Sequence, residues 1–203
     1  MSYALDDHGA IISVNPLSTH SPEEWAASFA VEPRWAAAHL GEQKWRPAMA
    51  GSPVHVTCPS CSSINRIPAE RPAGQAKCGT CHQPLFAGKP VTVDAASFER
   101  QIGRNDIPVL VDFWAPWCGP CRAMAPAYER AAAELEPGFR LLKLDTEEEP
   151  GVAARYNIHS IPTLMLFIGG REIARRAGAS DTRSIIAWAN AQVAGYQPTA
   201  SAR

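Results

Sequence analysis

Residues 111–121 read Val-Asp-Phe-Trp-Ala-Pro-Trp-Cys-Gly-Pro-Cys, and this stretch decides the fold of the chain. The mostly apolar run over 108–114 is typical of a buried central strand. A long run of helix-forming residues follows and predicts a helix over about 119–135. Cys118 and Cys121 therefore lie where a buried strand passes into a helix.

This placement suits a redox-active dithiol. Two cysteines three positions apart on one helical turn have Cα atoms about 5 to 6 Å apart, a separation that suits a disulfide. The unpaired N–H groups and the dipole of a helix N-terminus stabilise a thiolate there. We therefore expect Cys118 to be the exposed nucleophile and Cys121 the shielded resolving thiol in thiol–disulfide exchange. Pro120 has no N–H to donate toward the Cys118 sulfur, which favours a reductant over an oxidant.

The elements around this junction alternate between strands and helices. Strands are expected at 91–93, 139–144, 163–168 and 171–176, and helices at 95–102 after the cap Asp94, near 149–155, and from the cap Asp181 to about 193. Gly169-Gly170 is expected to turn the last two strands into a hairpin. The order predicts an α/β fold, a mixed sheet flanked by helices.

These motifs closely resemble the thioredoxin family. The resemblance rests on residues 111–121, on Lys143-Leu-Asp and on Ser-Ile-Pro-Thr at 160–163. It implies a thioredoxin fold over 89–195 and the activity of a protein-disulfide reductase, an oxidoreductase.

The family's functional positions carry over onto matching residues. Asp112 matches a buried carboxylate beneath the dithiol; burial should raise its pKa and let it accept the proton of Cys121. The resemblance makes Lys143 the charge beside Asp112 and Pro162 a cis-proline facing the dithiol. The substrate-docking surface it implies comprises Trp117, Gly119, Pro120, the Ile161 backbone, Pro162 and Gly178, with Gly170 also contributing.

Residues 54–88 carry a second cysteine pattern. Cys58-x2-Cys61 and Cys78-x2-Cys81 are sixteen residues apart, a spacing typical of a four-cysteine zinc site. The segment has few large apolar residues and needs such a staple to fold. Four thiolates close the coordination sphere, which indicates a structural site, with iron as the main competing metal.

The residues around these cysteines extend the resemblance to a branch of the family. Ile64-Asn-Arg-Ile-Pro, Ala76-Lys-Cys-Gly and Leu85-Phe86 resemble thioredoxin 2, the branch with an N-terminal zinc module. His55 and His82 are interpreted as residues outside the ligand set. A structural staple and a redox sensor that loses zinc on oxidation are equally open interpretations of the module.

Composition narrows the compartment and the partners. All six cysteines fall in three Cys-x-x-Cys pairs, and no secretory or transit signal is visible, so we expect a cytoplasmic protein and not a secreted disulfide scaffold. No apolar stretch approaches the roughly 18 residues of a membrane helix. A net charge of −1 gives no field for nucleic acid or anionic lipid. We expect a monomer that acts on disulfide-containing proteins.

The ends of the chain are harder to interpret. Residues 1–53 form an extension with short helices expected at about 21–30 and 33–41, and 196–203 form a tail. The three tryptophans of the extension could grip a partner, or the segment could be loosely packed and partly disordered. The native start could be Met1 or Met49.

Two functions from different classes remain at this point. The leading one is a disulfide reductase recharged by an NADPH-dependent thioredoxin reductase, because this chain has no Gly-x-Gly-x-x-Gly fingerprint and so no expected organic cofactor. The alternative is a zinc-dependent, redox-switched chaperone with secondary exchange activity. An oxidase or isomerase is disfavoured by the Gly-Pro dipeptide at 119–120.

Overall fold

The computed structural model describes residues 2–5, 11–14 and 53–196 of the chain. The chain divides into two units, 1–42 and 43–203. In the first, β1 (Ser2–Leu5) pairs antiparallel with β2 (Ile11–Val14). We did not predict this hairpin, although the β-branched run of β2 favours a strand. The helices expected at 21–30 and 33–41 lie outside the described residues.

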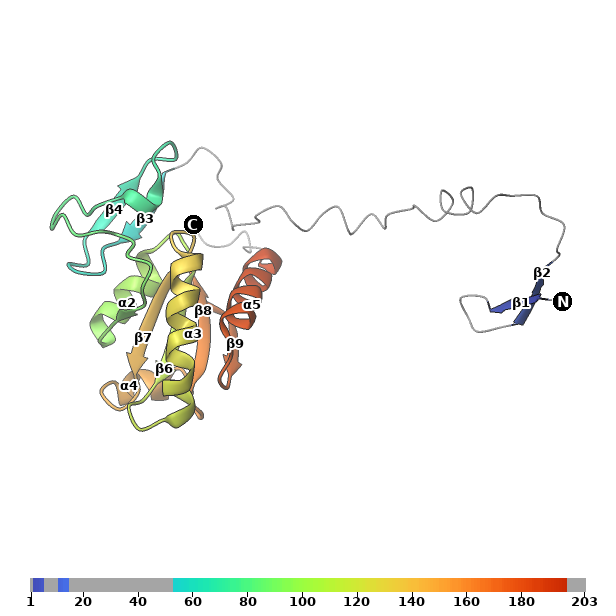
Figure 1. Cartoon of the computed structure of the whole chain (residues 1–203). Helices are drawn as coiled ribbons and strands as arrows, with labels where there is room; N and C mark the ends of the chain where they lie inside the picture. The colour runs from blue at the N-terminus through green and yellow to red at the C-terminus, as the bar shows by residue number, and fades with distance from the viewer. Residues whose placement is uncertain (1, 6–10, 15–52, 197–203) are drawn as a thin grey trace. The chain divides into compact units, whose positions relative to one another are not determined.

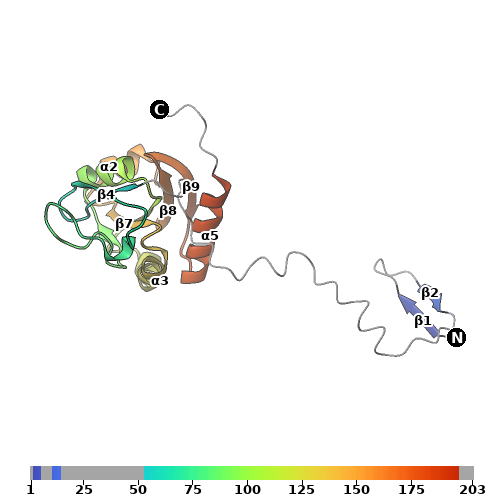
Figure 2. The same ribbon diagram turned by 90° about the horizontal axis from the view of Figure 1, so that it is seen from above.

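A five-stranded mixed sheet forms the centre of the second unit (Figures 1 and 2). Its strands are β5 (Val91–Thr92), β6 (Val109–Trp114), β7 (Arg140–Asp145), β8 (Thr163–Ile168) and β9 (Arg171–Ala177). They lie in the order β5-β7-β6-β8-β9. The first three are parallel, β8 runs antiparallel to β6, and β9 returns antiparallel to β8. The predicted α/β fold with a mixed sheet is confirmed.

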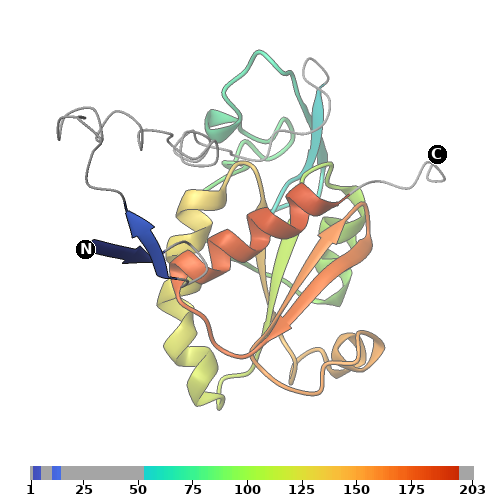
Figure 3. The ribbon, with the colours of Figure 1, turned by 90° about the vertical axis from the view of Figure 1, so that its right-hand side faces the viewer.

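Helices cover both faces of this sheet (Figure 3). They are α2 (Ala95–Arg104), α3 (Gly119–Leu135), α4 (Pro150–Arg155) and α5 (Thr182–Gly195). Asp94 and Asp181 cap α2 and α5 by accepting a backbone N–H three residues on, as expected. No helix in the described part of the chain is long and apolar enough to cross a membrane.

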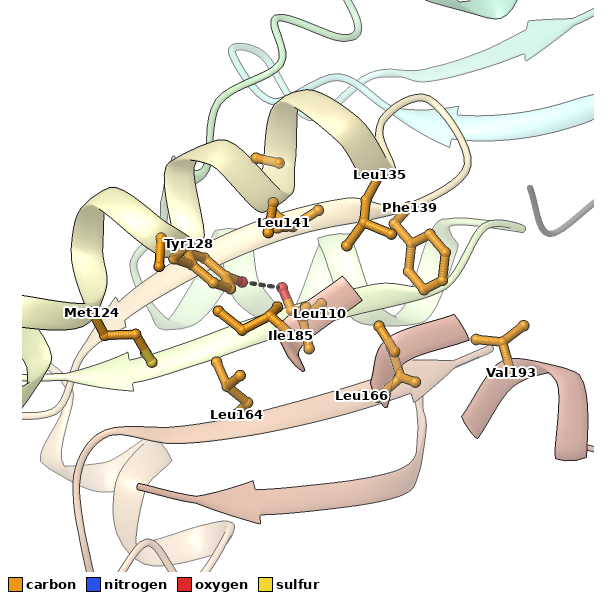
Figure 4. Close-up of a cluster of buried hydrophobic side chains, with 14 residues drawn as sticks. Leu110, Met124, Tyr128, Leu135, Phe139, Leu141, Leu164, Leu166, Ile185 and Val193 are labelled. Atoms are coloured by element: carbon orange, nitrogen blue, oxygen red, sulfur yellow. Dashed lines mark hydrogen bonds between the residues drawn. The ribbon is translucent and has the colours of Figure 1, made fainter. Parts of the chain in front are cut away.

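Alternation along β6 sets which side chains face the redox helix. Leu110 packs in a cluster with α3 and α5, shown in Figure 4. Val109, Val111 and Phe113 pack in the opposite cluster with α2 and α4. Because successive strand side chains point to opposite faces, Asp112 shares the face of Leu110 and lies on the α3 side of the sheet.

Residues 54–88 form a small ribbon of their own. β3 (Val54–Thr57) pairs antiparallel with β4 (Ile64–Ile67), and a short 3-10 turn, η2 (Ala73–Gln75), follows. A buried cluster made of Val56, Cys58, Ile67, Cys78, Leu85, Phe86 and Ile107 is its core. Ile107 lies between α2 and β6, so this core is shared with the thioredoxin-like part of the chain.

Candidate functional site

Cys118 and Cys121 form a disulfide at the start of α3, with Cα atoms 5.3 Å apart. The expected separation is confirmed. Cys118 is the N-cap of the helix, and the backbone N–H of Cys121 donates to the Cys118 sulfur at 3.1 Å. The amide end of the helix is therefore aimed at the sulfur that the sequence marks as the nucleophile.

The expected exposure of Cys118 is wrong for this oxidised form. Cys118 is 3% exposed and Cys121 is 2% exposed, so neither is an open nucleophile. The Cys118 sulfur is covered because it is bonded to Cys121 and lies 3.7 Å from the Ile161 carbonyl oxygen. Its surroundings are open, since the Trp117 ring next to it is 65% exposed. Gly119 and Pro120 are exposed as well.

A buried carboxylate lies on the same side of the sheet. Asp112 is 1% exposed, and its Oδ1 has no hydrogen-bond partner among the described residues. Desolvation raises the pKa of Asp112 to about 7, while the charge of Lys143 opposes the rise. Lys143 is the register neighbour of Asp112 on β7, and its Nζ lies 4.1 Å from the centre of the Trp114 ring. The structure thus brings both residues together.

The loop before β8 completes the surface around the dithiol. The Ile161–Pro162 peptide is cis, as the resemblance implied. Gly178 has φ +92°, a conformation that favours glycine, and its N–H donates to the Pro162 carbonyl at 2.8 Å. Ile161, Pro162 and Gly178 therefore form one connected edge beside Cys118.

Gly170 does not belong to this surface. It lies in the β8–β9 turn, and its N–H donates to the carbonyl of Ile102 on α2. Because β8 starts at the dithiol and runs antiparallel to β6, it finishes at the opposite end of the strands, next to the start of β6. The strand direction overturns the expectation.

Tyr128 is a buried polar residue that we did not single out. Its hydroxyl lies 2.9 Å from the Leu110 carbonyl, a hydrogen bond drawn in Figure 4, and 3.0 Å from the Leu142 carbonyl, so its one proton is shared between β6 and β7. The signal was its position seven residues after Cys121, which puts both on one face of α3.

The other four cysteines meet in the ribbon. The sulfurs of Cys58, Cys61, Cys78 and Cys81 all lie within 4.8 Å of one another. Two contacts cross between the two pairs, at 3.6 Å for Cys58–Cys81 and 3.6 Å for Cys61–Cys78. A tetrahedral zinc with Zn–S of about 2.3 Å places neighbouring sulfurs about 3.8 Å apart, so the donor set fits this metal.

Each pair is held in a tight turn of the same design. Ser62 and His82, which follow the second cysteine of each pair, have φ +60° and +61°. The N–H groups of Ser60 and Thr80 point at the sulfurs of Cys58 and Cys78 at 3.4 Å. Hydrogen bonds from the backbone, first that of Cys81, lower the pKa of Cys78 to about 5. Over an opposing backbone hydrogen bond at Gln83, burial and the other three sulfurs raise the pKa of Cys81 to about 12, so a metal that binds here must displace a proton from that thiol.

The two histidines near these pairs lie outside the sulfur cluster. His55 pairs with Asp106, its Nδ1 lying 2.9 Å from the Asp106 Oδ2. His82 occupies the turn position described above. Neither belongs to the group of potential ligands found among the described residues.

Comparisons with known proteins agree with both sites. The family model Thioredoxin matches residues 89–191, and the model described as Thioredoxin 2, N-terminal, matches residues 57–83. Thioredoxin C-3 of Corynebacterium nephridii is 40% identical over 138 residues, covering 68% of this chain and 94% of that protein. Thioredoxin of Porphyra purpurea is 48% identical over 87 residues, covering 43% of this chain and 81% of that protein. A crystal structure of chloroplastic thioredoxin z, 27% identical, gives a TM-score of 0.49 over 53% of this chain and 96% of that one.

The matched segments contain the dithiol and the four-cysteine cluster respectively. The first segment, 89–191, is a thioredoxin-type disulfide oxidoreductase domain. The second, 57–83, is the zinc ribbon module that precedes it. The chain therefore belongs to the thioredoxin family, in the thioredoxin 2 branch.

Proposed function

We propose that this chain is a cytoplasmic protein-disulfide reductase that works through Cys118 and Cys121 and is recharged by an NADPH-dependent thioredoxin reductase. The observation that carries the proposal is the Cys121 N–H donated to the Cys118 sulfur at the first turn of α3. A sulfur that accepts this N–H at a helix N-terminus is stabilised as a thiolate, the reactive form in exchange.

The reaction runs in two displacements. The Cys118 thiolate attacks one sulfur of a substrate disulfide, forming a mixed disulfide and releasing the other substrate sulfur as a thiolate. The Cys121 thiolate then attacks the Cys118 sulfur, which breaks the mixed disulfide and frees the second substrate sulfur. Two electrons pass to the substrate, and the Cys118–Cys121 bond remains for the reductase partner to reduce.

Asp112 supplies the proton acceptor for the second step. Its pKa of about 7 leaves it partly ionised at neutral pH, so it can take the Cys121 proton and return it later. The Lys143 charge opposes the effect of burial and keeps the ionised form accessible. A carboxylate with an ordinary pKa would be a weaker base for a thiol.

The surface around the dithiol suits an extended peptide. The Trp117 ring is exposed, and so are Gly119 and Pro120, which follow the redox cysteine Cys118. The backbone at Ile161, held by the cis bond to Pro162 and by Gly178, lies next to the Cys118 sulfur and would pair with substrate main chain. Disulfide-containing proteins are therefore the proposed substrates.

We further propose that Cys58, Cys61, Cys78 and Cys81 bind one Zn²⁺. Bound there, the metal ties the two cysteine turns together and supplies folding energy to a ribbon with a small core. Full coordination by sulfur leaves no position for substrate, which supports a structural role. A zinc-switched chaperone remains the competing function for the module.

Reduction of insulin by dithiothreitol or by NADPH with thioredoxin reductase tests the function. Cys118→Ser should abolish turnover with either reductant, and Cys121→Ser should trap mixed disulfides with substrate. Retained turnover in Cys118→Ser would defeat the proposal. Suppression of citrate synthase aggregation by Cys118→Ser, dependent on peroxide treatment, would favour the chaperone.

A further inference from the structure

Two buried side-chain amides at the end of α2 contact the zinc ribbon. The Gln101 Nε2 donates to the carbonyl of the ligand Cys58 at 3.3 Å. The Asn105 Oδ1 accepts the N–H of Thr57 at 2.8 Å, and its Nδ2 donates to the Gln101 Oε1 at 2.9 Å. Gln101 is 1% exposed and Asn105 is 3% exposed. Two linked side chains from outside the ribbon therefore fix the peptide that positions one ligand sulfur.

A buried ion pair at the C-terminal end of α3 also contacts the ribbon. Glu136, the C-cap of α3, pairs with Arg140 of β7 at 2.8 Å, and the two side chains are 3% and 1% exposed. The Arg140 Nη2 donates to the Leu85 carbonyl at 2.6 Å, and its guanidinium lies 4.8 Å from the Phe86 ring centre. Glu136 accepts the N–H groups of Gly88 and Ala87, at 2.7 and 3.1 Å.

Charge gives this pair a role beyond packing. Four thiolates around Zn²⁺ carry a net charge of −2, which is costly next to a buried apolar core without a counter-charge. Leu85 and Phe86, which Arg140 contacts, share that core with Cys58 and Cys78. Burial lowers the pKa of Arg140, and the charge of Glu136 opposes that shift. The contacts with Leu85 and Phe86 place its guanidinium at the core that also holds Cys58 and Cys78.

We infer that the thioredoxin domain supplies the outer shell of the metal centre, with Gln101 holding the Cys58 peptide and the cationic end of the buried Glu136–Arg140 pair lying against the ribbon core beside the ligand sulfurs. The inference rests on the proposed zinc binding. Outer-shell partners orient ligands and tune metal affinity, and their loss commonly weakens binding about 10- to 100-fold. Zinc affinity therefore depends on residues of the thioredoxin domain as well as on the ribbon.

The test is the zinc dissociation constant of the full chain, measured by competition with a chromophoric chelator. Gln101→Met keeps the volume of the side chain but loses the hydrogen bond to Cys58. The double variant Glu136→Gln with Arg140→Met removes the ion pair and the hydrogen bond to the Leu85 carbonyl without leaving either charge buried alone. Each should bind zinc at least about tenfold more weakly than the natural chain.

Two controls separate the possible failures. Arg155→Met removes an arginine that pairs with Glu99 of α2, and it should leave zinc affinity unchanged because that pair is exposed. Insulin reduction reports correct folding of each variant. The dithiol is too far from Glu136 to be affected directly, because the 17 residues of α3, about 26 Å of helix, separate Cys118 from Glu136. Unchanged zinc affinity in both shell variants would overturn the inference. A natural chain that binds no zinc would instead overturn the metal proposal on which it rests.

Discussion

Cys118-x-x-Cys121 and the two ribbon pairs share one spacing but differ in backbone. At the dithiol the chain continues as a 17-residue helix, and its N–H groups converge on the first sulfur. In the ribbon, Ser62 and His82 take positive φ and turn the chain back. The residues after a Cys-x-x-Cys pair, more than its spacing, therefore decide whether the sulfurs join each other or converge on a metal.

The sulfur contacts express the same difference. Cys118 and Cys121 are bonded to each other. In the ribbon, sulfurs of opposite turns lie 3.6 Å apart, in Cys58–Cys81 and in Cys61–Cys78. A redox pair works within one turn, whereas a metal site links two.

The largest effects are expected when one cysteine of each region is replaced by serine, which tests whether the two regions have separate roles. Cys118→Ser should lose insulin reduction entirely, because the nucleophile is gone. Cys61→Ser should keep insulin reduction but lose bound zinc, because the ribbon then offers three thiolates. Activity is measured by insulin turbidity and zinc by atomic absorption. Loss of activity in both variants alike would contradict the separation of the two roles.

A second variant probes the buried carboxylate, which has no equivalent in the ribbon. The rise in the pKa of Asp112 from 3.8 to about 7 corresponds to about 4 kcal/mol. The protonated form is favoured in the fold, so its stabilising effect is present below pH 3.8 and is lost as pH rises through about 7. Asp112→Asn should therefore raise the free energy of unfolding of the oxidised chain by about 4 kcal/mol at pH 8.

Urea titrations at several pH values check this prediction. The gain from Asp112→Asn should shrink toward pH 4, where the natural carboxyl is already neutral. Insulin reduction should slow at neutral pH, because Cys121 loses its proton acceptor. A gain that is the same at pH 4 and pH 8 would show that burial does not perturb this carboxyl.

Sequence patterns predicted the thioredoxin-like elements well, because each carries its own signal. The run of helix-forming residues after Cys118 and the stop at Pro137-Gly138 predicted α3 over 119–135, and Asp94 and Asp181 marked two helix starts. The cis bond before Pro162 came from the resemblance alone, since cis X-Pro is a minority state without a local signal.

The remaining features depend on contacts between distant segments. In the sequence, Glu136 and Arg140 are opposite charges four residues apart, a pattern typical of an exposed pair. In the structure both side chains are buried against the ribbon. The cover over Cys118 comes from Ile161, forty-three positions away. Gly170 lies away from the dithiol because β8 runs antiparallel to β6, a strand direction that the local residues do not reveal.

A smaller effect is expected from the residue between the two redox cysteines. Pro120→His adds a backbone N–H near the Cys118 sulfur and should stabilise the thiolate further. The reduction potential should rise by at least about 30 mV, which corresponds to about 1.4 kcal/mol. Equilibration against glutathione measures it, and an unchanged midpoint would rule out this role for the proline.

The smallest expected effect concerns the helix on which the ribbon docks. The Asp94 carboxylate accepts the Ser97 N–H at 2.7 Å, and this hydrogen bond lowers the pKa of Asp94. Asp94→Ala should lower the free energy of unfolding, because the Ser97 N–H loses its capping partner. The loss should vanish as acid protonates the cap. Asp181→Ala, at the start of α5 away from the ribbon, is the matched control and should cost a similar amount.

The most direct measurement is the pH dependence of alkylation at each cysteine of the reduced chain, read by mass spectrometry. The account predicts that Cys118 reacts first and titrates below the ordinary thiol pKa of about 8.5, with Cys121 slower at every pH. Faster reaction at Cys121, or an ordinary titration at Cys118, would contradict it.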